Sequence, residues 1–425
     1  MIKIINGNSL EELKTFPDNY FHSVVTDPPY GLSFMGKKWD YDVPSVELWK
    51  EVLRVLKEGG YLLSFAGTRT QHRMAVNIED AGFEIRDMIA WVYGSGFPKS
   101  HNIGKAVDRL NGKDIPKNKG FNVAGQGIAL NSNRELRSDH PKYVKPKYDN
   151  DWEGWGTALK PALEPITMAR KPFKTTVAEN VLKNGVGGIN IDGCRVEGKP
   201  RTTHKGFNKV GVYQDKEKKY GQIKDGAIYK QPQGRFPANF IHDGSDEVKD
   251  LFPESKVSGT AKLGKENTSR PYSANIYGKY KPNKSFLHND QGSASRFFYC
   301  AKASKQDRNE GLEDFEDTIN PYSPNAVGGQ GLRTSTNKSS ETTKNNHPTV
   351  KPTDLMRYLV RLVTPKEGIV LDCFMGSGST GKACALEGFN FVGIDLDKDY
   401  CEIAKARIDK AIEDKRIMDS QMKLF

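Results

Sequence analysis

The segment Asp27-Pro28-Pro29-Tyr30 gathers groups that could do chemistry near the start of the chain. It follows residues 22–26, whose β-branched composition predicts a strand. The two prolines fix φ and hold the preceding backbone extended, so the turn is stiff. A carboxylate, a proline carbonyl and an aromatic ring then share one small volume, which suits a flat base that carries an exocyclic amino group. A proline-rich turn that only ends a strand explains these residues equally well when they are taken alone.

A glycine-rich segment near the other end of the chain, residues 369–381, predicts a strand, a tight turn and the start of a helix. Its glycines, among them Gly376 and Gly378, let the backbone approach a ligand, and the helix N-terminus offers free N–H groups. The next apolar segment ends at Asp395, whose carboxylate can hold two ribose hydroxyls. The glycine spacing also fits a dinucleotide loop, so an NAD-dependent oxidoreductase is an alternative. Asp372 would repel a pyrophosphate but suits the ammonium of a methionine moiety, which favours S-adenosylmethionine over NAD.

The hydrophobic pattern indicates the α/β scaffold that must position these residues. Strand and helix patterns alternate over residues 1–93, which predicts a parallel sheet with covering helices. Residues 94–156 break the alternation and predict a long loop rich in Gly, Asn, Lys and Pro. Residues 164–170 predict a return to the sheet as an antiparallel edge strand. Alternation resumes after residue 353 and ends in a charged amphipathic helix over 398–412.

The middle of the chain, residues 171–346, shows no sustained alternation of helix and strand. Short strands are predicted at 188–191 and 238–241, among polar segments rich in Lys and Gly. Aromatic residues are interleaved with basic ones, as in Arg296-Phe297-Phe298-Tyr299. Such mixing suits a nucleic-acid surface, where cations neutralise phosphates and rings stack on bases. For most of these rings we favour the alternative, that they form a small core of the insertion.

Composition narrows the class of protein. The 425 residues allow one catalytic domain with a sizeable insertion, and 64 Lys and Arg against 53 Asp and Glu give a net charge of +11. That charge is a hint of a polyanionic partner, although an ordinary solvated surface also accounts for it. The five cysteines are scattered without a CxxC pair, which favours reduced thiols over disulfides or a metal site. No signal-peptide pattern or membrane span is recognisable, so we expect a cytoplasmic protein with no membrane partner.

Four motifs taken together resemble those of the DNA amino-methyltransferases, which methylate the exocyclic nitrogen of adenine or cytosine. They are DPPY, HPTVKP (347–352), LDCFMGSGST and FVGID, and their order is similar to that of the β group of this family. GWGTALKPALEPI, GRFPANFIHDG and SRFFYCAKASK are similar to segments of phage- and prophage-encoded members. The resemblance implies an α/β, Rossmann-like sheet of the S-adenosylmethionine-dependent methyltransferases, mostly parallel with an antiparallel edge strand. A large inserted target-recognition region would complete the chain.

The resemblance also implies an organisation along the chain and a set of partners. Residues 1–100 would carry the catalytic half, 101–156 an inserted loop that contacts DNA, 157–171 the return strand, 172–345 the target-recognition region and 346–425 the cofactor-binding half. Double-stranded DNA would be the substrate. A homodimer and a cognate restriction endonuclease are further expected partners.

Carried over residue by residue, the resemblance implies the members of the site. The catalytic residues would be Asp27, Pro28, Pro29 and Tyr30. The cofactor-binding residues would be Asp372, Phe374, Gly376, Ser377, Gly378, Asp395, His347, Thr349 and Lys351. His347 would otherwise pin a loop, and Lys351 would otherwise be a solvated charge. Asn8 stands where many relatives carry an acid, which leaves a cofactor contact there in doubt, and Cys373 is better explained as a packed thiol than as a nucleophile.

Several functions remain open from the sequence. DPPY accompanies adenine N6 more often than cytosine N4 among relatives, so adenine is the expected target and cytosine the alternative. Oxidoreduction with NAD leaves DPPY unexplained. A non-catalytic DNA-binding subunit would usually have lost the acid of DPPY or a cofactor glycine, and this chain keeps both. Methylation of RNA or of a protein glutamine is a further alternative, and the long basic middle region favours nucleic acid over protein.

Overall fold

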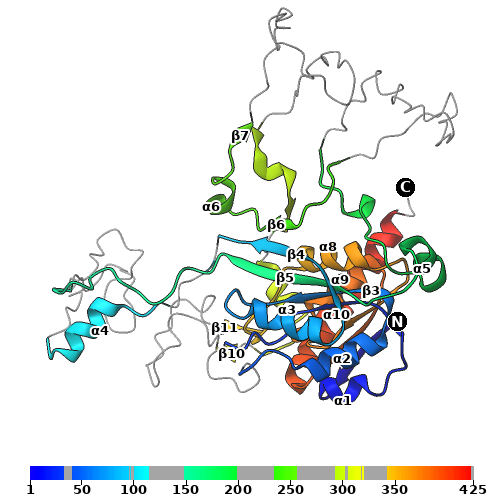
Figure 1. The fold of residues 1–425 in the computed structure, drawn as a ribbon, viewed down its shortest axis with the longest axis horizontal. Helices are drawn as coiled ribbons and strands as arrows, with labels where there is room; N and C mark the ends of the chain where they lie inside the picture. The colour runs from blue at the N-terminus through cyan, green and yellow to red at the C-terminus, as the bar shows by residue number, and fades with distance from the viewer. Residues whose placement is uncertain are drawn as a thin grey trace, which may run out of the picture.

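The computed structural model describes residues 1–32, 41–94, 96, 100–113, 148–198, 234–255, 292–301, 305–316, 318–319 and 342–422. Within these residues the chain folds around a nine-stranded sheet with helices on both faces (Figure 1). In spatial order the strands are β1 (Ile2–Asn6), β13 (Asn390–Asp395), β12 (Ile369–Asp372), β2 (Phe21–Thr26), β3 (Leu56–Phe65), β5 (Leu163–Arg170), β4 (Glu84–Val92), β6 (Phe240–His242) and β9 (Tyr299–Cys300). The predicted α/β class with a mostly parallel sheet is confirmed.

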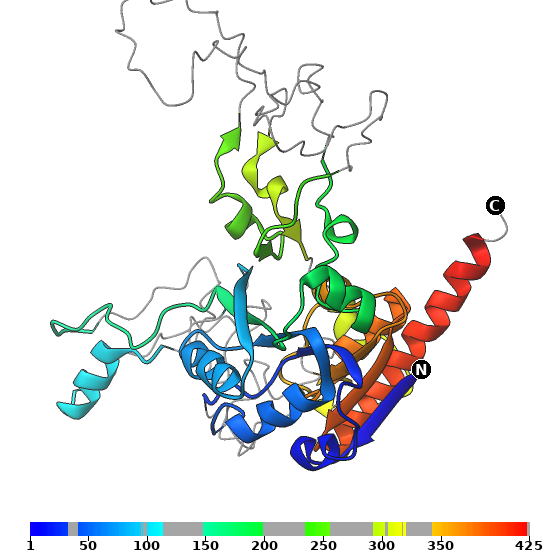
Figure 2. The same cartoon turned by 45° about the vertical axis from the view of Figure 1, so that its right-hand side comes forward.

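Two sets of helices bury the two faces of the sheet. One face is covered by α1 (Ser9–Leu13), α2 (Val46–Val55) and α3 (Gln71–Asp80), and the other by α8 (Thr353–Val363), α9 (Ser379–Glu387) and α10 (Lys398–Met422). Trp49 and Met74 are fully buried on the first face, and Leu359 and Ile408 on the second. Parallel strands need both faces covered in this way. The helix predicted over 398–412 continues to Met422 and extends away from the sheet (Figure 2).

Strand β5 is antiparallel, as predicted, but it does not lie at an edge. It pairs with β3 on one side and with β4 on the other, both antiparallel. The prediction of an edge strand is therefore wrong. Its residues from Pro165 to Arg170 are all buried, and a strand buried on both faces belongs inside a sheet. Pro165 lies just beyond the β3 ladder, whose last pair joins Phe65 to Ile166, so it interrupts no pairing with β3.

The middle of the chain contributes two strands to the main sheet. β6 pairs in parallel with β4, and β9 pairs in parallel with β6, so the two strands extend the sheet past β4. The strand predicted at 238–241 is confirmed with its bounds shifted to Phe240–His242. The strand predicted at 188–191 is wrong, because that segment is irregular and leads into a 3₁₀ helix. The Asn190 N–H donates to the carbonyl of Leu362 in α8, so the segment docks on a helix instead of a strand.

The remaining elements are short. They are α4 (Ile103–Leu110), α5 (Val177–Asn184), α6 (Asp246–Lys249), α7 (Lys305–Asn309), the 3₁₀ helices Asp192–Cys194 and Ala294–Phe297, and the pairs β7 (Glu254–Ser255) with β8 (Gly292–Ser293) and β10 (Thr318–Ile319) with β11 (Thr342–Thr343). None of the helices in the described residues is long and apolar enough to cross a membrane.

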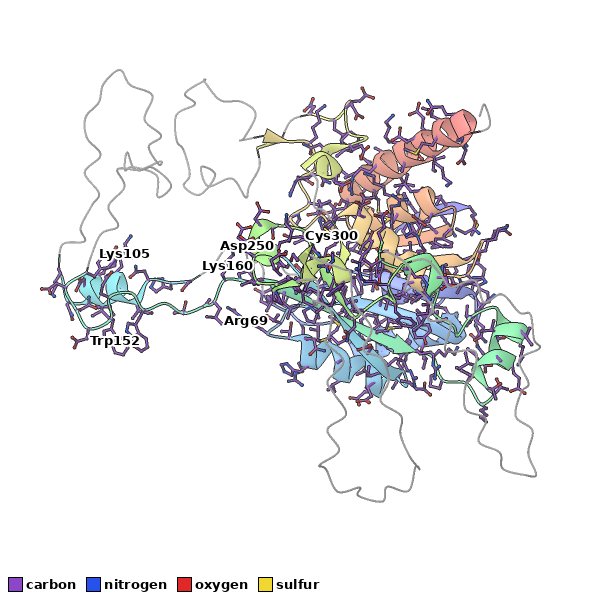
Figure 3. The ribbon with its side chains drawn as sticks, turned by 90° about the horizontal axis from the view of Figure 1, so that it is seen from above. Arg69, Lys105, Trp152, Lys160, Asp250 and Cys300 are labelled. Carbon is purple, nitrogen blue, oxygen red and sulfur yellow. The ribbon has the colours of Figure 1, made fainter. Side chains whose placement is uncertain are left out.

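Helix α4 belongs to an arm, defined here as residues 100–113 and 148–160, that projects from the body of the molecule (Figure 1). The loop predicted over 94–156 thus contains a helix, and residues 114–147 lie outside the described residues. Figure 3 shows Lys105 and Trp152 on the arm, with Arg69 and Lys160 nearer the body. An isolated bridge between Asn102 and Gly156 joins the two sides of the arm where it leaves the body.

Candidate active site

A cavity of about 1370 Å³ lies where β2, β12 and β13 end. Its lining comes from the Asp27–Tyr30 turn, the turn after β12, the end of β13 and the segment before α8. The carboxyl ends of parallel strands meet at one edge of a sheet, and ligands of α/β proteins bind there. The fold therefore brings together segments from the two ends of the chain, as the site prediction required. The thirteen predicted site residues except Gly378 line this cavity.

The catalytic turn forms a closed cluster of hydrogen bonds with two further side chains. The Tyr30 hydroxyl lies 2.7 Å from Asp27 Oδ1 and 3.1 Å from Glu164 Oε2. The Lys351 ammonium lies 2.5 Å from Asp27 Oδ2 and 3.3 Å from Glu164 Oε2. It also donates to the Tyr30 hydroxyl at 3.3 Å. Four polar side chains from three distant segments thus hold one another at the wall of the cavity.

Burial and charge set the protonation of this cluster. Burial, together with the carboxylates of Asp27 and Glu164, raises the pKa of Tyr30 well above its ordinary value, so the phenol keeps its proton. Burial alone would lower the pKa of Lys351, but the same two carboxylates outweigh it and raise that pKa. The Lys351 side chain is 7% exposed. Lys351 is therefore a buried cation paired with two acids, and not a solvated surface charge.

Glu164 is a member of the site that the sequence did not reveal. The sequence predicts it only as the first residue of a strand. Because β5 is antiparallel, its first residues lie at the same sheet edge as the carboxyl ends of β2 and β3. The available signal was an acid immediately before the apolar run 165–169, in a strand that returns to the sheet. Tyr93 belongs to the same region, since burial and the nearby Glu164 carboxylate raise the pKa of its phenol.

The glycine turn after β12 is shaped by two residues with positive φ. Gly376 has φ of 50° and Gly378 has φ of 79°, a region that side chains rarely adopt. A Cβ on Gly376 would lie 2.6 Å from Nε2 of His347, and a Cβ on Gly378 would lie 2.8 Å from the Cβ of Ala404. The turn is therefore packed tightly between His347 on one side and α10 on the other.

Two carboxylates flank this turn. Asp372 accepts hydrogen bonds from Thr26 Oγ1 at 2.6 Å and Thr380 Oγ1 at 2.5 Å. Burial raises the pKa of Asp372 to about 6, although these hydroxyls oppose the shift. Asp395 accepts the Gly376 N–H at 2.7 Å, and burial raises its pKa as well. Both acids line the cavity.

Four predicted cofactor residues take different positions. His347 Nδ1 lies 2.9 Å from the Thr349 carbonyl, so these two residues pin their own loop while lining the cavity. Burial lowers the pKa of His347 to about 4, which keeps the ring neutral near pH 7. Ser377 turns its hydroxyl to the buried Arg407, at 3.1 Å. Phe374 packs partly against the core below α1.

Two other residues bear on the sequence predictions. Asn8 lines the cavity, but its side chain accepts the N–H groups of Leu10 and Glu11 and so caps α1. Cys373 is fully buried, and burial raises the pKa of its thiol, which is the behaviour of a packed side chain. Among the described residues no group of His, Cys, Asp and Glu is arranged to hold a metal ion.

Comparison with known proteins places the chain in a family. A sequence profile of the N6/N4 methyltransferases, described as DNA methylase, matches residues 21–406. The chain belongs to this family. The resemblance drawn from its four motifs is thereby confirmed, as is the type of fold.

Curated relatives of this chain include type II methyltransferases. One is M.HindIII of Haemophilus influenzae, 27% identical over 231 residues, which are 44% of this chain and 64% of that protein. Another is M2.LlaDCHI of Lactococcus lactis subsp. cremoris, 40% identical over 73 residues, which are 17% of this chain and 27% of that protein. The chain thus spans less than two thirds of the length of these relatives.

Solved structures similar to this chain include a complex of M1.HpyAVI with SAM. It is 16% identical, covers 96% of this chain and 100% of its own, and has a TM-score of 0.36. The cytosine-N4-specific PvuII DNA methyltransferase is 13% identical, with coverages of 95% and 85% and a TM-score of 0.40.

Proposed function

We propose that this DNA methylase transfers the methyl group of S-adenosylmethionine to the exocyclic N6 of an adenine flipped out of duplex DNA. The observation that supports this most directly is the shared cavity of about 1370 Å³, which opens onto both the Asp27–Tyr30 turn and the glycine turn at Gly376. A methyl donor and its target must touch, so their binding groups have to face one space.

The residues around the glycine turn fit such a cofactor. The two positive-φ glycines allow a tight turn, because a side chain at either position would collide with His347 or Ala404, and Gly376 lines the cavity. Asp395, at the end of β13, offers acceptors for ribose hydroxyls, and Asp372 offers negative charge to a methionine ammonium. Bound there, S-adenosylmethionine would supply an electrophilic methyl group on a sulfonium centre. We assign Phe374, His347 and Thr349 to the walls of this subsite.

The proposed work of the catalytic turn is to make a poor nucleophile reactive. The lone pair of an exocyclic amine is delocalised into its ring. Hydrogen bonds from its two N–H groups to the Asp27 carboxylate and the Pro28 carbonyl favour a pyramidal nitrogen, whose lone pair is free for in-line attack. Tyr30 would stack on the flipped base and recover part of the few kcal/mol spent on unstacking it. A methylated aminium is acidic, so Asp27 need not be a strong base to help remove its proton.

Adenine is proposed over cytosine because the tetrapeptide is DPPY, which accompanies adenine more often among similar methyltransferases. Both amines offer the same two hydrogens, and cytosine N4 is the second candidate. Duplex DNA as the substrate is supported by the net charge of +11. We keep 101–156 as a DNA-contact segment and 172–345 as the target-recognition region. A homodimer and a cognate endonuclease are part of the proposal, as is a cytoplasmic location.

The test is incubation with labelled S-adenosylmethionine and unmethylated genomic DNA, followed by nucleoside analysis. The expected product is N6-methyladenine. Detection of N4-methylcytosine instead would show that the target base is cytosine. Asp27→Ala is expected to abolish transfer while its thermal unfolding remains cooperative. Asp409→Ala, at an exposed ion pair on α10, is the matched control and should keep full activity. Absence of any labelled nucleoside with the unaltered protein would overturn the proposed function.

A further inference from the structure

Asp27 belongs to a ring of four side chains, one of which is an acid without an assigned role. Glu164 contacts the Lys351 ammonium at 3.3 Å and the Tyr30 hydroxyl at 3.1 Å. Each of these two partners also contacts one oxygen of Asp27, at 2.5 Å for Lys351 and 2.7 Å for Tyr30. Glu164 is therefore linked to both oxygens of the catalytic acid without touching it.

The Lys351 ammonium uses all of its hydrogen-bond donors within this ring. Its three N–H donors have three partners, the carboxylates of Asp27 and Glu164 and the hydroxyl of Tyr30. A long lysine side chain with three anchors has little freedom. Loss of Glu164 would leave the ammonium anchored only by the residues that act on the base.

Both oxygens of Asp27 are occupied by the chain's own donors, which fixes the plane of the carboxylate. Each oxygen retains a second lone pair that can accept a hydrogen bond from a target amine. Small errors in the position of this acceptor matter, because in-line attack requires the reacting atoms to be close and aligned. The ring thus determines where the amine is held.

The charge of the ring is equally important. Two carboxylates and one ammonium, with a neutral phenol, sum to a net charge of −1. The target amine becomes more positive as it gains a methyl group. A pocket with one excess negative charge stabilises that change, whereas an Asp27–Lys351 pair alone would be neutral. The Lys351 side chain is 7% exposed and that of Glu164 is 20% exposed, so water screens these charges little.

We propose that Glu164 is a positioning residue for methyl transfer, which acts through Lys351 and Tyr30 to fix the Asp27 carboxylate and to give the base pocket its net negative charge. This inference rests on the proposed function. It also moves Lys351 from the cofactor subsite, where the sequence placed it, to the base subsite.

The first test is Glu164→Gln, which keeps the shape of the side chain and removes its charge. With DNA and labelled S-adenosylmethionine, kcat is expected to fall by on the order of tenfold or more, while the Kd of the cofactor and the KM of DNA change less than about twofold. Glu164→Asp should recover part of the rate. The matched control is Glu84→Gln on β4, which breaks the ion pair between Glu84 and Arg170. Arg170 lies at the opposite end of β5 from Glu164, so this variant should keep the kcat of the unaltered protein.

The second test is a double-mutant cycle on Glu164 and Lys351. Lys351→Met leaves the Asp27 and Glu164 carboxylates in one ring without their shared cation, so the two negative charges repel each other. Its kcat should therefore fall well below that of the unaltered protein near pH 7. Adding Glu164→Gln removes the repulsion, so the double variant should be faster than Lys351→Met alone near pH 7, a result that a purely structural role would not give.

The outcomes separate the two proposals. A Glu164→Gln protein with unchanged kcat, or a double variant slower than Lys351→Met, would overturn the role of Glu164 while the methyltransferase activity stands. Failure of the unaltered protein to methylate any DNA would overturn the proposed function itself. Should Lys351→Met fail to fold, Lys351→Arg and the Glu164 variants still decide the matter, since Glu164→Gln preserves volume and hydrogen bonding.

Discussion

The guanidinium of Arg407 on α10 donates hydrogen bonds to both the carbonyl and the hydroxyl oxygen of Ser377 in the glycine turn. Arg407 is fully buried, and its other terminal nitrogen donates to the Asp307 carbonyl of α7 at 2.8 Å. Helix α10 thus holds the backbone that shapes the cofactor subsite. A second tie runs from Arg308, whose guanidinium donates to the His347 carbonyl at 2.6 Å.

Arg407→Met should weaken cofactor binding, because the Ser377 and Asp307 carbonyls lose a buried donor. We expect the Kd of S-adenosylmethionine, measured by calorimetry, to rise by about tenfold, and the free energy of unfolding to fall by about 1–3 kcal/mol. Lys405→Met, at an exposed ion pair on the same helix, should change neither. Unchanged affinity in a folded Arg407→Met protein would show that the turn keeps its shape without this contact.

Cofactor binding should weaken in mild acid through Asp372. Burial raises the pKa of Asp372 to about 6, so below that pH the group becomes neutral and no longer attracts a methionine ammonium. A bound cation favours the ionised form, and binding near pH 6 should therefore release a proton. We expect the Kd to rise as the pH falls from 7.5 to 5.5, with proton release detected by calorimetry in two buffers. Asp372→Asn should bind weakly at both pH values; His347, with a pKa of about 4, stays neutral throughout this range.

The raised pKa of Asp372 also affects the stability of the fold. A carboxyl whose pKa is raised in the folded state binds its proton more tightly there than in the unfolded chain. Asp372 therefore destabilises the fold above pH 6, and this penalty decreases as the pH falls toward 4. Thermal unfolding of Asp372→Asn against the unaltered protein, at pH 5 and pH 7.5, measures the difference.

Gly376→Ala should damage the cofactor subsite more than an equally strained glycine elsewhere. The added Cβ would meet the ring of His347 at 2.6 Å, which must move with its loop. Gly388→Ala is the matched control, since Gly388 has φ of 82° but its nearest neighbour would be 3.9 Å from a Cβ. Both variants should lose stability by about 1 kcal/mol from backbone strain. A loss of cofactor affinity of about tenfold is expected for Gly376→Ala alone.

The arm should contribute to DNA binding. Lys105 and Arg109 are exposed and lie four residues apart, so they share one face of α4, and with His101 just before the helix they line a hollow of about 280 Å³. Trp152 and Trp155, across the arm, are 47% and 59% exposed. Replacing Lys105 and Arg109 by Ala should raise the KM of DNA severalfold with little change in kcat, and should flatten its dependence on salt. Lys398→Ala with Lys405→Ala is the control, and an unaltered KM in the arm variant would exclude the arm from the interface.

The parts of the site that lie at carboxyl ends of parallel strands were predictable from the sequence. Asp27 and Asp372 each follow a short apolar run, and β2 pairs with β12, so the topology alone brings them together. The features that the sequence did not reveal, the membership of Glu164 and the contact of Lys351 with Asp27, come from places where direction or reach decides. Glu164 depends on β5 running antiparallel inside the sheet, and a long excursion separates it from β4. Lys351 depends on the rotamers of a long side chain, which no local pattern specifies.

The role of α10 was hidden for a different reason. Its pattern predicted a charged amphipathic helix, and most of its charges are exposed. Arg407 is the exception, because α7 and the glycine turn cover it. α7 itself has five residues, too few for periodicity to reveal it. Contacts of this kind follow only from the assembled fold.

The order of strands in the sheet also determines when each strand can pair during translation. β1 and β2 are completed within the first 26 residues, yet β13 and β12 lie between them and are made only at residues 369–395. At about 5–20 residues per second, translation leaves both early strands with an unpaired edge for roughly 20–70 s. Such edges invite association with other chains. Messages truncated before residue 369 should therefore yield aggregated or chaperone-bound polypeptide, in contrast to the full-length product.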